Sequence, residues 1–466
     1  MIAPHSPYPT VLPRSDVSTG VGLAGLAGLA AWILFCRSYP EIAAALGLGG
    51  SLGVERGVLS GPYAALATML FTALPMVLWS VLVDKVHLRP STGIDWSLKR
   101  PLAEVMPVAV IKLVGLWATW ALIAAFYALA RWYWSGNYLF AMDVLSFAIF
   151  PLVILSVPYV IWLDRVLVEP RDGAFHFGAF VVGGGLVGRD QWDGAAIAKH
   201  WRAWAIKCFF GAFMISILPP GFAQVVEAQP AQILGNPVEF AMLLVTLLFV
   251  IDVQIGTVGY LLTLRPLDSH IRSGNPFLAG WLAALICYPP FVLGIIGPND
   301  QILSYAFNTP GWAHWFAANT ALLWAWGGLL VFLTGVYAWA TVVFGIRFSN
   351  LTYRGVLTNG PYRFTRHPAY LAKNLFWWAS VLPFIVTSGG WLEPVRNCVF
   401  LLVVNAMYYW RARTEEAHLI AEDPKYAEYH AWMERRGLIT APLARLKRLL
   451  TGGVTPPREA HAFPAE

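Results

Sequence analysis

Long apolar runs constrain this chain more than any other feature of its sequence. Of its 466 residues, 58% are hydrophobic and only 12% are charged, a balance that a water-soluble globule of this length does not need. The sequence therefore predicts an all-α, polytopic integral membrane protein. We expect about ten transmembrane helices, at residues 21–35, 61–83, 104–130, 142–163, 203–224, 238–264, 277–297, 318–345, 370–388 and 396–410.

Lysine and arginine are distributed unevenly among the connecting loops. The loops after the second, fourth, sixth and eighth expected helices hold most of these cations, whereas the intervening loops hold few. Because positively charged loops face the cytoplasm, we expect both termini and the loop before residue 370 to be cytoplasmic. The same cations account for the net charge of +6, so we expect membrane lipids rather than nucleic acid as partners.

The N-terminal part offers few chemical signals. Residues 1–20 form a polar leader, and the apolar run after it is interpreted as a retained helix because no small-x-small cleavage site follows. Gly22, Gly25 and Gly28 would let another helix approach closely. The four cysteines are scattered without C-x-x-C spacing, so we predict neither a disulfide framework nor a metal site.

One polar loop between two apolar runs carries dense chemistry. It reads LTNGPYRFTRHPAY from Leu357 to Tyr370, and its glycine and prolines give it a fixed shape. The simpler interpretation is that its cations anchor helix ends at lipid headgroups. The alternative is a site for an anionic ligand or a cofactor. The residues that would serve such a site are Tyr362, Arg363, Arg366, His367 and Tyr370.

A second charged stretch, RARTEEAHL, follows one more hydrophobic hairpin. Alone, Arg411 and Glu415 fit an i,i+4 ion pair on a helix surface, worth roughly 0.2–0.5 kcal/mol. Together, the two stretches resemble the isoprenylcysteine carboxyl methyltransferase family and its phospholipid methyltransferase relatives, over roughly residues 315–445. The family pattern is G-x-Y-x-x-x-R-H-P-x-Y, a helical hairpin, then R-x-x-x-E-E-x-x-L and a Tyr-rich tail. The matching residues are Gly360, Tyr362, Arg366, His367, Pro368, Tyr370, Arg411, Glu415, Glu416 and Leu419.

This resemblance implies an S-adenosylmethionine-dependent methyltransferase that acts at the cytoplasmic face on a lipid or lipidated substrate. The leading acceptor is a carboxylate of isoprenylcysteine type, which Arg411 would orient as the catalytic residue. A planar guanidinium suits bidentate capture of a carboxylate. By the same resemblance, S-adenosylmethionine would be held by Arg354, Gly355, Val356, Leu357, Tyr362, His367, Pro368, Ala369, Tyr370 and Glu415.

Three alternatives remain open on the sequence. The acceptor could be the amine of a phospholipid headgroup. The chain could also be an NADPH-dependent enzyme similar to membrane sterol reductases, although the acidic pair Glu415 and Glu416 suits a nicotinamide 2′-phosphate poorly. A non-enzymatic transporter or scaffold is the third, because Lys112 and Asp252 stand inside expected spans, where pairing with a neighbouring helix is the simpler role.

We divide the chain into four regions: a leader at 1–20, a multi-helix membrane region of unassigned role at 21–313, the methyltransferase-like region at 314–445 and a disordered tail at 446–466. The multi-helix region could form a lipid-substrate chamber or a separate module. Residues 183–188, GGGLVG, fit a dinucleotide pattern but lack any βαβ context, so we interpret them as a flexible or re-entrant segment. Lys373 and Asn374 depart from the family pattern, as does the stretch Arg347 to Asn350, and indicate a subfamily with its own substrate.

Overall fold

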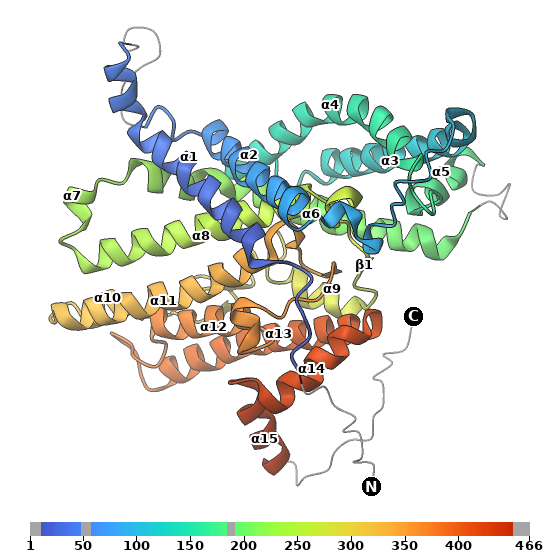
Figure 1. The fold of residues 1–466 in the computed structure, drawn as a ribbon. Coiled ribbons are helices and arrows are strands. Elements are labelled where there is room, and N and C mark those ends of the chain that lie inside the picture. Colours follow the sequence, from blue (N-terminus) through green and yellow to red (C-terminus); the bar gives the residue numbers. More distant parts are fainter. Residues whose placement is uncertain (1–10, 48–56, 184–191, 451–466) are drawn as a thin grey trace.

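Helices make up most of the described chain (Figure 1). The computed structural model describes residues 11–47, 57–183 and 192–450. Within these ranges, seven helical segments are long and apolar enough to cross a membrane. The predicted all-α membrane protein is confirmed. The seven segments are Thr19–Ala45 (α1), Pro62–Val83 (α2, Pro62–Leu78, and one π turn), Leu102–Ala130 (α3), Gly136–Asp164 (mainly α4, Leu139–Asp164), Gly194–Glu227 (α6), Pro237–Leu261 (α8) and Thr320–Arg347 (mainly α11, Thr320–Phe344).

The remaining elements are shorter or more polar. The two strand pairs are only two residues long in each strand: β1 (Ser273–Gly274) pairs antiparallel with β4 (Thr352–Tyr353), and β2 (Ile296–Gly297) pairs parallel with β3 (Leu303–Ser304). The other α-helices are α5 (Gly173–Val182), α7 (Pro230–Ile233), α9 (Leu278–Leu285), α10 (Trp312–Trp315), α12 (Pro368–Val381), α13 (Leu392–Glu422), α14 (Pro424–Arg436) and α15 (Thr440–Leu450).

Three of the ten expected spans are not confirmed. The run at 277–297 contains only α9, which ends at Leu285, and then turns through Pro289 and Pro290, which lack the backbone N–H that a helix uses. With 14 residues, α12 is about 21 Å long, less than the roughly 30 Å of a bilayer's hydrocarbon core. The run at 396–410 lies inside the longer α13, where Asn397 and Asn405 interrupt the apolar sequence.

The chain between α9 and α11 returns from one end of α11 to the other. At the C-terminal end of α11, Arg347 binds Asp268 at 2.5 Å, and near the N-terminal end Trp312 of α10 packs with Leu323 and Leu330. The chain from Asp268 to Trp312 therefore runs along α11, from its C-terminal end to its N-terminal end. It consists of the short helix α9, turns and the β2–β3 pair (Figure 1). Non-helical backbone at membrane depth is tolerated where it is buried in protein or lines a cavity.

Glycines in α1 permit close helix packing, as predicted. A Cβ on Gly22 would lie 1.9 Å from the carbonyl oxygen of Val342 in α11, and one on Gly28 would lie 2.0 Å from that of Phe71 in α2. Any larger residue would push these backbones apart. The glycines therefore hold α1 against both helices.

Ionisable residues inside the spans have structural partners. Lys112 Nζ lies 2.7 Å from an oxygen of Asp164 and 3.0 Å from one of Asp172. Lys207 Nζ lies 3.4 Å from the ring centroid of Trp204. Asp252 of α8, for which pairing with a neighbouring helix was the simpler role, accepts a hydrogen bond from the Thr341 hydroxyl of α11, which confirms that expectation.

The loops predicted to share one side of the membrane lie together. The loops after α2, α8 and α11 meet around Asp268, and a bridge between Ile94 and Leu167 adds the loop after α4. The α14–α15 pair forms the predicted helical tail, but α15 continues to Leu450, so the domain boundary expected at 445 falls inside a helix. Residues 184–188 of the glycine segment and residues 451–466 of the expected tail lie outside the described residues.

Candidate functional site

Backbone restrictions shape the loop from Leu357 to Tyr370. Residues Gly360–Arg363 form a 3₁₀ turn, and Gly360 has a φ of 54°, in the left-handed region that favours glycine. A Cβ on Gly360 would also lie 2.5 Å from Val343 Cγ2. Helix α12 then begins at Pro368, a position where proline is compatible with a helix start. The sequence thus places His367 and Tyr370 at the first turn of a helix.

The Glu416 carboxylate joins this loop to α13 and α14. Its Oε1 lies 2.6 Å from Arg366 Nε and 3.0 Å from His367 Nε2, and its Oε2 lies 2.8 Å from Arg413 Nη1 and 3.6 Å from His430 Nε2. Burial alone would raise the pKa of Glu416. The hydrogen bond from His367, the nearby His430 and the charge of Arg366 outweigh burial and hold that pKa well below its usual range. Glu416 therefore fixes the histidine of the motif.

One of the two oxygens of the Glu415 carboxylate accepts hydrogen bonds within the protein. Its Oε1 accepts hydrogen bonds from the Tyr370 hydroxyl at 2.5 Å and from Arg411 Nε at 3.1 Å. Within the part of the chain that the structure describes, no donor is recorded at its Oε2. The Tyr370 ring also stacks on His367, with centroids 5.5 Å apart and planes 4° apart. Arg411 is only 2% exposed, so the Arg411–Glu415 pair is not the helix-surface pair that spacing alone suggested.

Two residues that the sequence analysis missed complete this cluster. Arg411 Nη2 donates to Asn350 Oδ1 at 2.5 Å, and its Nη1 donates to the Tyr288 hydroxyl at 3.4 Å. The departure of residues 347–350 from the family pattern could have identified Asn350. No such signal marked Tyr288, which lies in a run that was interpreted as a membrane span. All three guanidinium nitrogens of Arg411 are thus engaged. Capture of a carboxylate by Arg411 remains a prediction and would require one of these contacts to be exchanged.

One cavity of about 340 Å³ brings the predicted residues together. Of the eleven residues predicted to hold the methyl donor or orient the acceptor, only Pro368 does not line it, and Arg363 of the same loop does not line it either. The walls of this cavity therefore combine the motif loop, Leu357 to Tyr370, with the charged end of α13. The predicted residues in these walls are Arg354, Gly355, Val356, Leu357, Tyr362, His367, Ala369, Tyr370, Arg411 and Glu415.

The guanidinium of Arg354 is used within the protein. It donates to the backbone carbonyl oxygens of Gly259, Phe348 and Ile346, each at 2.9 Å, and also to that of Ser269. Burial, with the neighbouring charge of Arg347, lowers the pKa of Arg354 to about 9. Arg354 therefore fixes the shape of the cavity wall through its side chain.

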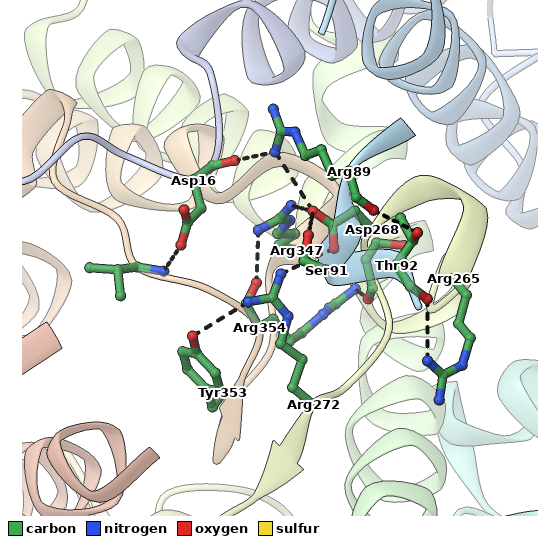
Figure 2. Close-up of polar contacts among 12 residues, drawn as sticks. Asp16, Arg89, Ser91, Thr92, Arg265, Asp268, Arg272, Arg347, Tyr353 and Arg354 are labelled. Carbon is green, nitrogen blue, oxygen red and sulfur yellow. Dashed lines mark hydrogen bonds and ion pairs between the residues drawn. The ribbon is translucent and has the colours of Figure 1, made fainter. Parts of the chain in front are cut away.

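A buried ionic cluster around Asp268 supports this wall (Figure 2). The Asp268 carboxylate, 1% exposed, lies 2.5 Å from Arg347 Nη2, 3.1 Å from Arg272 Nη2 and 3.7 Å from Arg89 Nη1. Arg347 in turn donates to the carbonyl oxygen of Arg354 at 3.0 Å. The cluster therefore ties two loops of the N-terminal region to the segment that leads into the motif loop.

The N-terminal segment also contacts the wall. Asp16 Oδ2 accepts a hydrogen bond from the Val356 amide at 2.7 Å, the Asp16 amide donates to the Val356 carbonyl at 2.9 Å, and Lys425 Nζ lies 2.6 Å from Asp16 Oδ1. Burial would raise the pKa of Asp16, but the hydrogen bonds from Lys425 and Val356 outweigh it and lower that pKa. In Figure 1, the blue segment before α1 runs along the C-terminal region accordingly. The described part of the expected leader, residues 11–20, thus contacts the wall of the site.

Helices of the unassigned region supply the apolar side of the cavity. Phe213 and Ile217 of α6 line it, as do Phe249 and Val253 of α8. Asp252 of α8 also lines it and accepts a hydrogen bond from the Thr341 hydroxyl. Helices of the region left unassigned thus line the same cavity as the motif residues.

Comparison with known proteins agrees with the two motifs. Residues 327–421 match the model of the isoprenylcysteine carboxyl methyltransferase family. The matched segment contains every residue predicted for the site. Comparison with curated proteins and with solved structures found no match. The resemblance inferred from the motifs is therefore confirmed: the C-terminal part of this chain matches the isoprenylcysteine carboxyl methyltransferase family, which supports a membrane methyltransferase.

Proposed function

We propose that this protein is an S-adenosylmethionine-dependent methyltransferase that acts at the cytoplasmic membrane face on a lipid or lipidated acceptor. The acceptor group is most simply a carboxylate of isoprenylcysteine type. The observation that carries the proposal is the single cavity that gathers ten of the eleven predicted site residues and continues into apolar walls. The cation-rich loops that meet beside it support a cytoplasmic placement.

The residues at the polar end suit the methyl donor. A cavity of about 340 Å³ lies within the roughly 300–1,000 Å³ typical of small-molecule sites. Glu415 Oε2 is positioned to accept hydrogen bonds from amino or ribose groups, because Tyr370 and Arg411 hold the other oxygen. The aromatic ring of Tyr362, which lines the cavity, suits a positively charged sulfonium. Glu416 keeps His367 in place beside Tyr370.

The acceptor step needs positioning more than proton transfer. The donor would supply a methyl group on a sulfonium. A carboxylate oxygen of the acceptor takes that methyl carbon in line, and the electron pair of the broken carbon–sulfur bond stays on sulfur. No proton is exchanged, so the chain needs no general base for this acceptor. The apolar walls of the cavity exclude water from the reacting groups.

A methyl-transfer assay on the detergent-purified protein tests this proposal. It would use S-adenosylmethionine with a radiolabelled methyl group and two acceptors, N-acetyl-S-farnesylcysteine and phosphatidylethanolamine. A methyl ester releases its label as methanol in base, whereas an N-methyl group does not. We expect base-labile label on the farnesylcysteine, lost in Glu415→Ala and kept in Glu428→Ala, because Glu428 is exposed on α14 and does not line the cavity.

Two outcomes would contradict parts of this proposal. Base-stable label on phosphatidylethanolamine alone would replace the carboxylate acceptor by an amine. Equal loss of activity in the Glu415→Ala and Glu428→Ala variants would contradict the role given to Glu415.

A further inference from the structure

We infer that Lys373 binds the acidic group of the methyl acceptor, while the acceptor's apolar chain lies between α6 and α8. This inference rests on the proposed function and deepens it, because it defines the acceptor class from the chain's own residues. The class is a molecule with an acidic group joined to a long apolar chain. In the sequence, Lys373 was visible only as a departure from the family pattern.

Lys373 lies on the face of α12 that lines the cavity. Tyr370 and Lys373 are three residues apart, a spacing that places two side chains on one helix face, and both line the cavity. With a rise of about 1.5 Å per residue, Lys373 stands about 4.5 Å further along the axis than Tyr370. The Tyr370 hydroxyl holds Glu415. An acid held by Lys373 would therefore lie next to a donor held at Glu415.

The ammonium group of Lys373 has aromatic neighbours but no acidic partner. Its Nζ lies 5.3 Å from the ring centroid of Trp377, 5.6 Å from that of Tyr408 and 5.7 Å from that of Tyr337. Among the described residues, no carboxylate oxygen lies within 4.0 Å of this nitrogen, and the Asp252 carboxylate, which lines the same cavity, attracts it only from a longer distance. Aromatic faces stabilise a cation without neutralising it. The charge therefore stays open to a ligand in the cavity.

The other charged groups that face the cavity near Lys373 are already engaged. Arg411 is bound to Glu415, Asn350 and the Tyr288 hydroxyl. Asp252 accepts a hydrogen bond from the hydroxyl of Thr341. A charge removed from water is costly until it is paired, and an acidic acceptor would supply the pair for Lys373.

An apolar path leads away from Lys373. The ring of Phe249 lies 5.9 Å from Tyr337, one of the three rings beside the ammonium group. A second cavity of about 120 Å³ lies between α6 and α8 and shares Ile217, Phe249 and Val253 with the first. These three apolar side chains thus form a wall that the two cavities share. A hydrocarbon chain attached to an acid at Lys373 would fit this path, with its far end between the two helices.

Equilibrium binding of two probes separates a charge-binding role from a packing role. The probes are N-acetyl-S-farnesylcysteine, which carries a carboxylate, and its neutral methyl ester. Binding would be measured on the detergent-purified full chain and on the variants Lys373→Met and Lys373→Arg. Lys207→Met is a matched control, because Lys207 also lies against an aromatic ring in a helix but does not line the cavity.

We expect Lys373→Met to weaken binding of the acid roughly 10- to 100-fold, the range of one charged hydrogen bond. Binding of the ester and of S-adenosylmethionine should change little, and Lys373→Arg should restore most of the affinity for the acid. Unchanged binding of the acid, or equal weakening of acid and ester, would overturn the inference. So would an amine probe, S-farnesylcysteamine, that binds more tightly than the acid.

The experiment also separates this inference from the proposed function. Neither probe has to be methylated in order to bind. A wild-type protein that binds the acid through Lys373 but never transfers a methyl group would contradict the proposed function and leave the acid-binding role of Lys373 intact. Methylation of the acid by the wild type that is unchanged in Lys373→Met would do the reverse.

Discussion

Replacement of Asp268 by asparagine should destabilise the protein strongly. The change keeps the side chain's shape but removes the charge that lies 2.5 Å from Arg347 and 3.1 Å from Arg272. The new amide group would point donors toward guanidinium donors, and Arg347, whose side chain is 5% exposed, would be left charged and buried. Breaking a buried ion pair by removing one partner costs about 3–5 kcal/mol. We expect a loss of that order in the free energy of unfolding.

The assay is thermal unfolding of the purified protein in one detergent. Asp95→Asn is the matched control, because Asp95 is exposed and the hydrogen bonds that its side chain makes within the described chain join it to Ser97, two residues away, so this variant should unfold at the wild-type temperature. A second variant, Arg347→Met, tests the mechanism. If Asp268→Asn is harmful because it strands a buried charge, the double variant should be more stable than the sum of the two single losses.

Two results would refute this reasoning. The first is an Asp268→Asn variant that unfolds at the same temperature as Asp95→Asn and the wild type. The second is strict additivity in the double variant, since two neighbouring groups that interact cannot give independent losses.

Three further predictions follow from the contacts of the cavity wall. Glu416 has a lowered pKa in the folded state. Its charged form therefore stabilises the fold above the ordinary pKa of 4.5, and this contribution is lost as the pH falls through the folded-state pKa. The melting temperatures of the wild type and Glu416→Gln should differ at neutral pH and converge in acid. Gly221→Leu places a side chain in the smaller cavity, where a Cβ already lies 3.1 Å from Val250 Cγ2, and should raise the KM of long-chain acceptors more than that of short ones. Asp16→Ala removes contacts to Val356 and Lys425 and should lower the affinity for S-adenosylmethionine, measured by calorimetry, with kcat affected less.

The sequence predicted those parts of the fold that depend on local composition. Seven spans are long apolar helices, and a helix's apolar length is readable from the residues themselves. The run at 277–297 was misinterpreted because apolar composition also fits turns that are buried inside a protein. Whether this run forms a membrane span or buried turns depends on its packing against α6 and α13, which cannot be inferred from composition.

The candidate site was predictable where residues lie in one motif and unpredictable where they meet across the fold. His367, Tyr370 and Glu415 were found from spacing and now line one cavity. Tyr288 and Asn350 were missed because their role depends on a contact with Arg411 that spans more than 60 residues of sequence. The spacing of Arg411 and Glu415 was visible, but the engagement of every Arg411 nitrogen was not.

The most direct test of the central claim is equilibrium binding of S-adenosylmethionine to the detergent-purified protein, with NADPH as competitor. We expect saturable binding that NADPH does not displace. The affinity should fall roughly 10- to 100-fold in Glu415→Ala, the range of a charged hydrogen bond, and stay unchanged in Glu428→Ala. No saturable binding, or binding of NADPH in its place, would contradict the claim that this cavity holds a methyl donor.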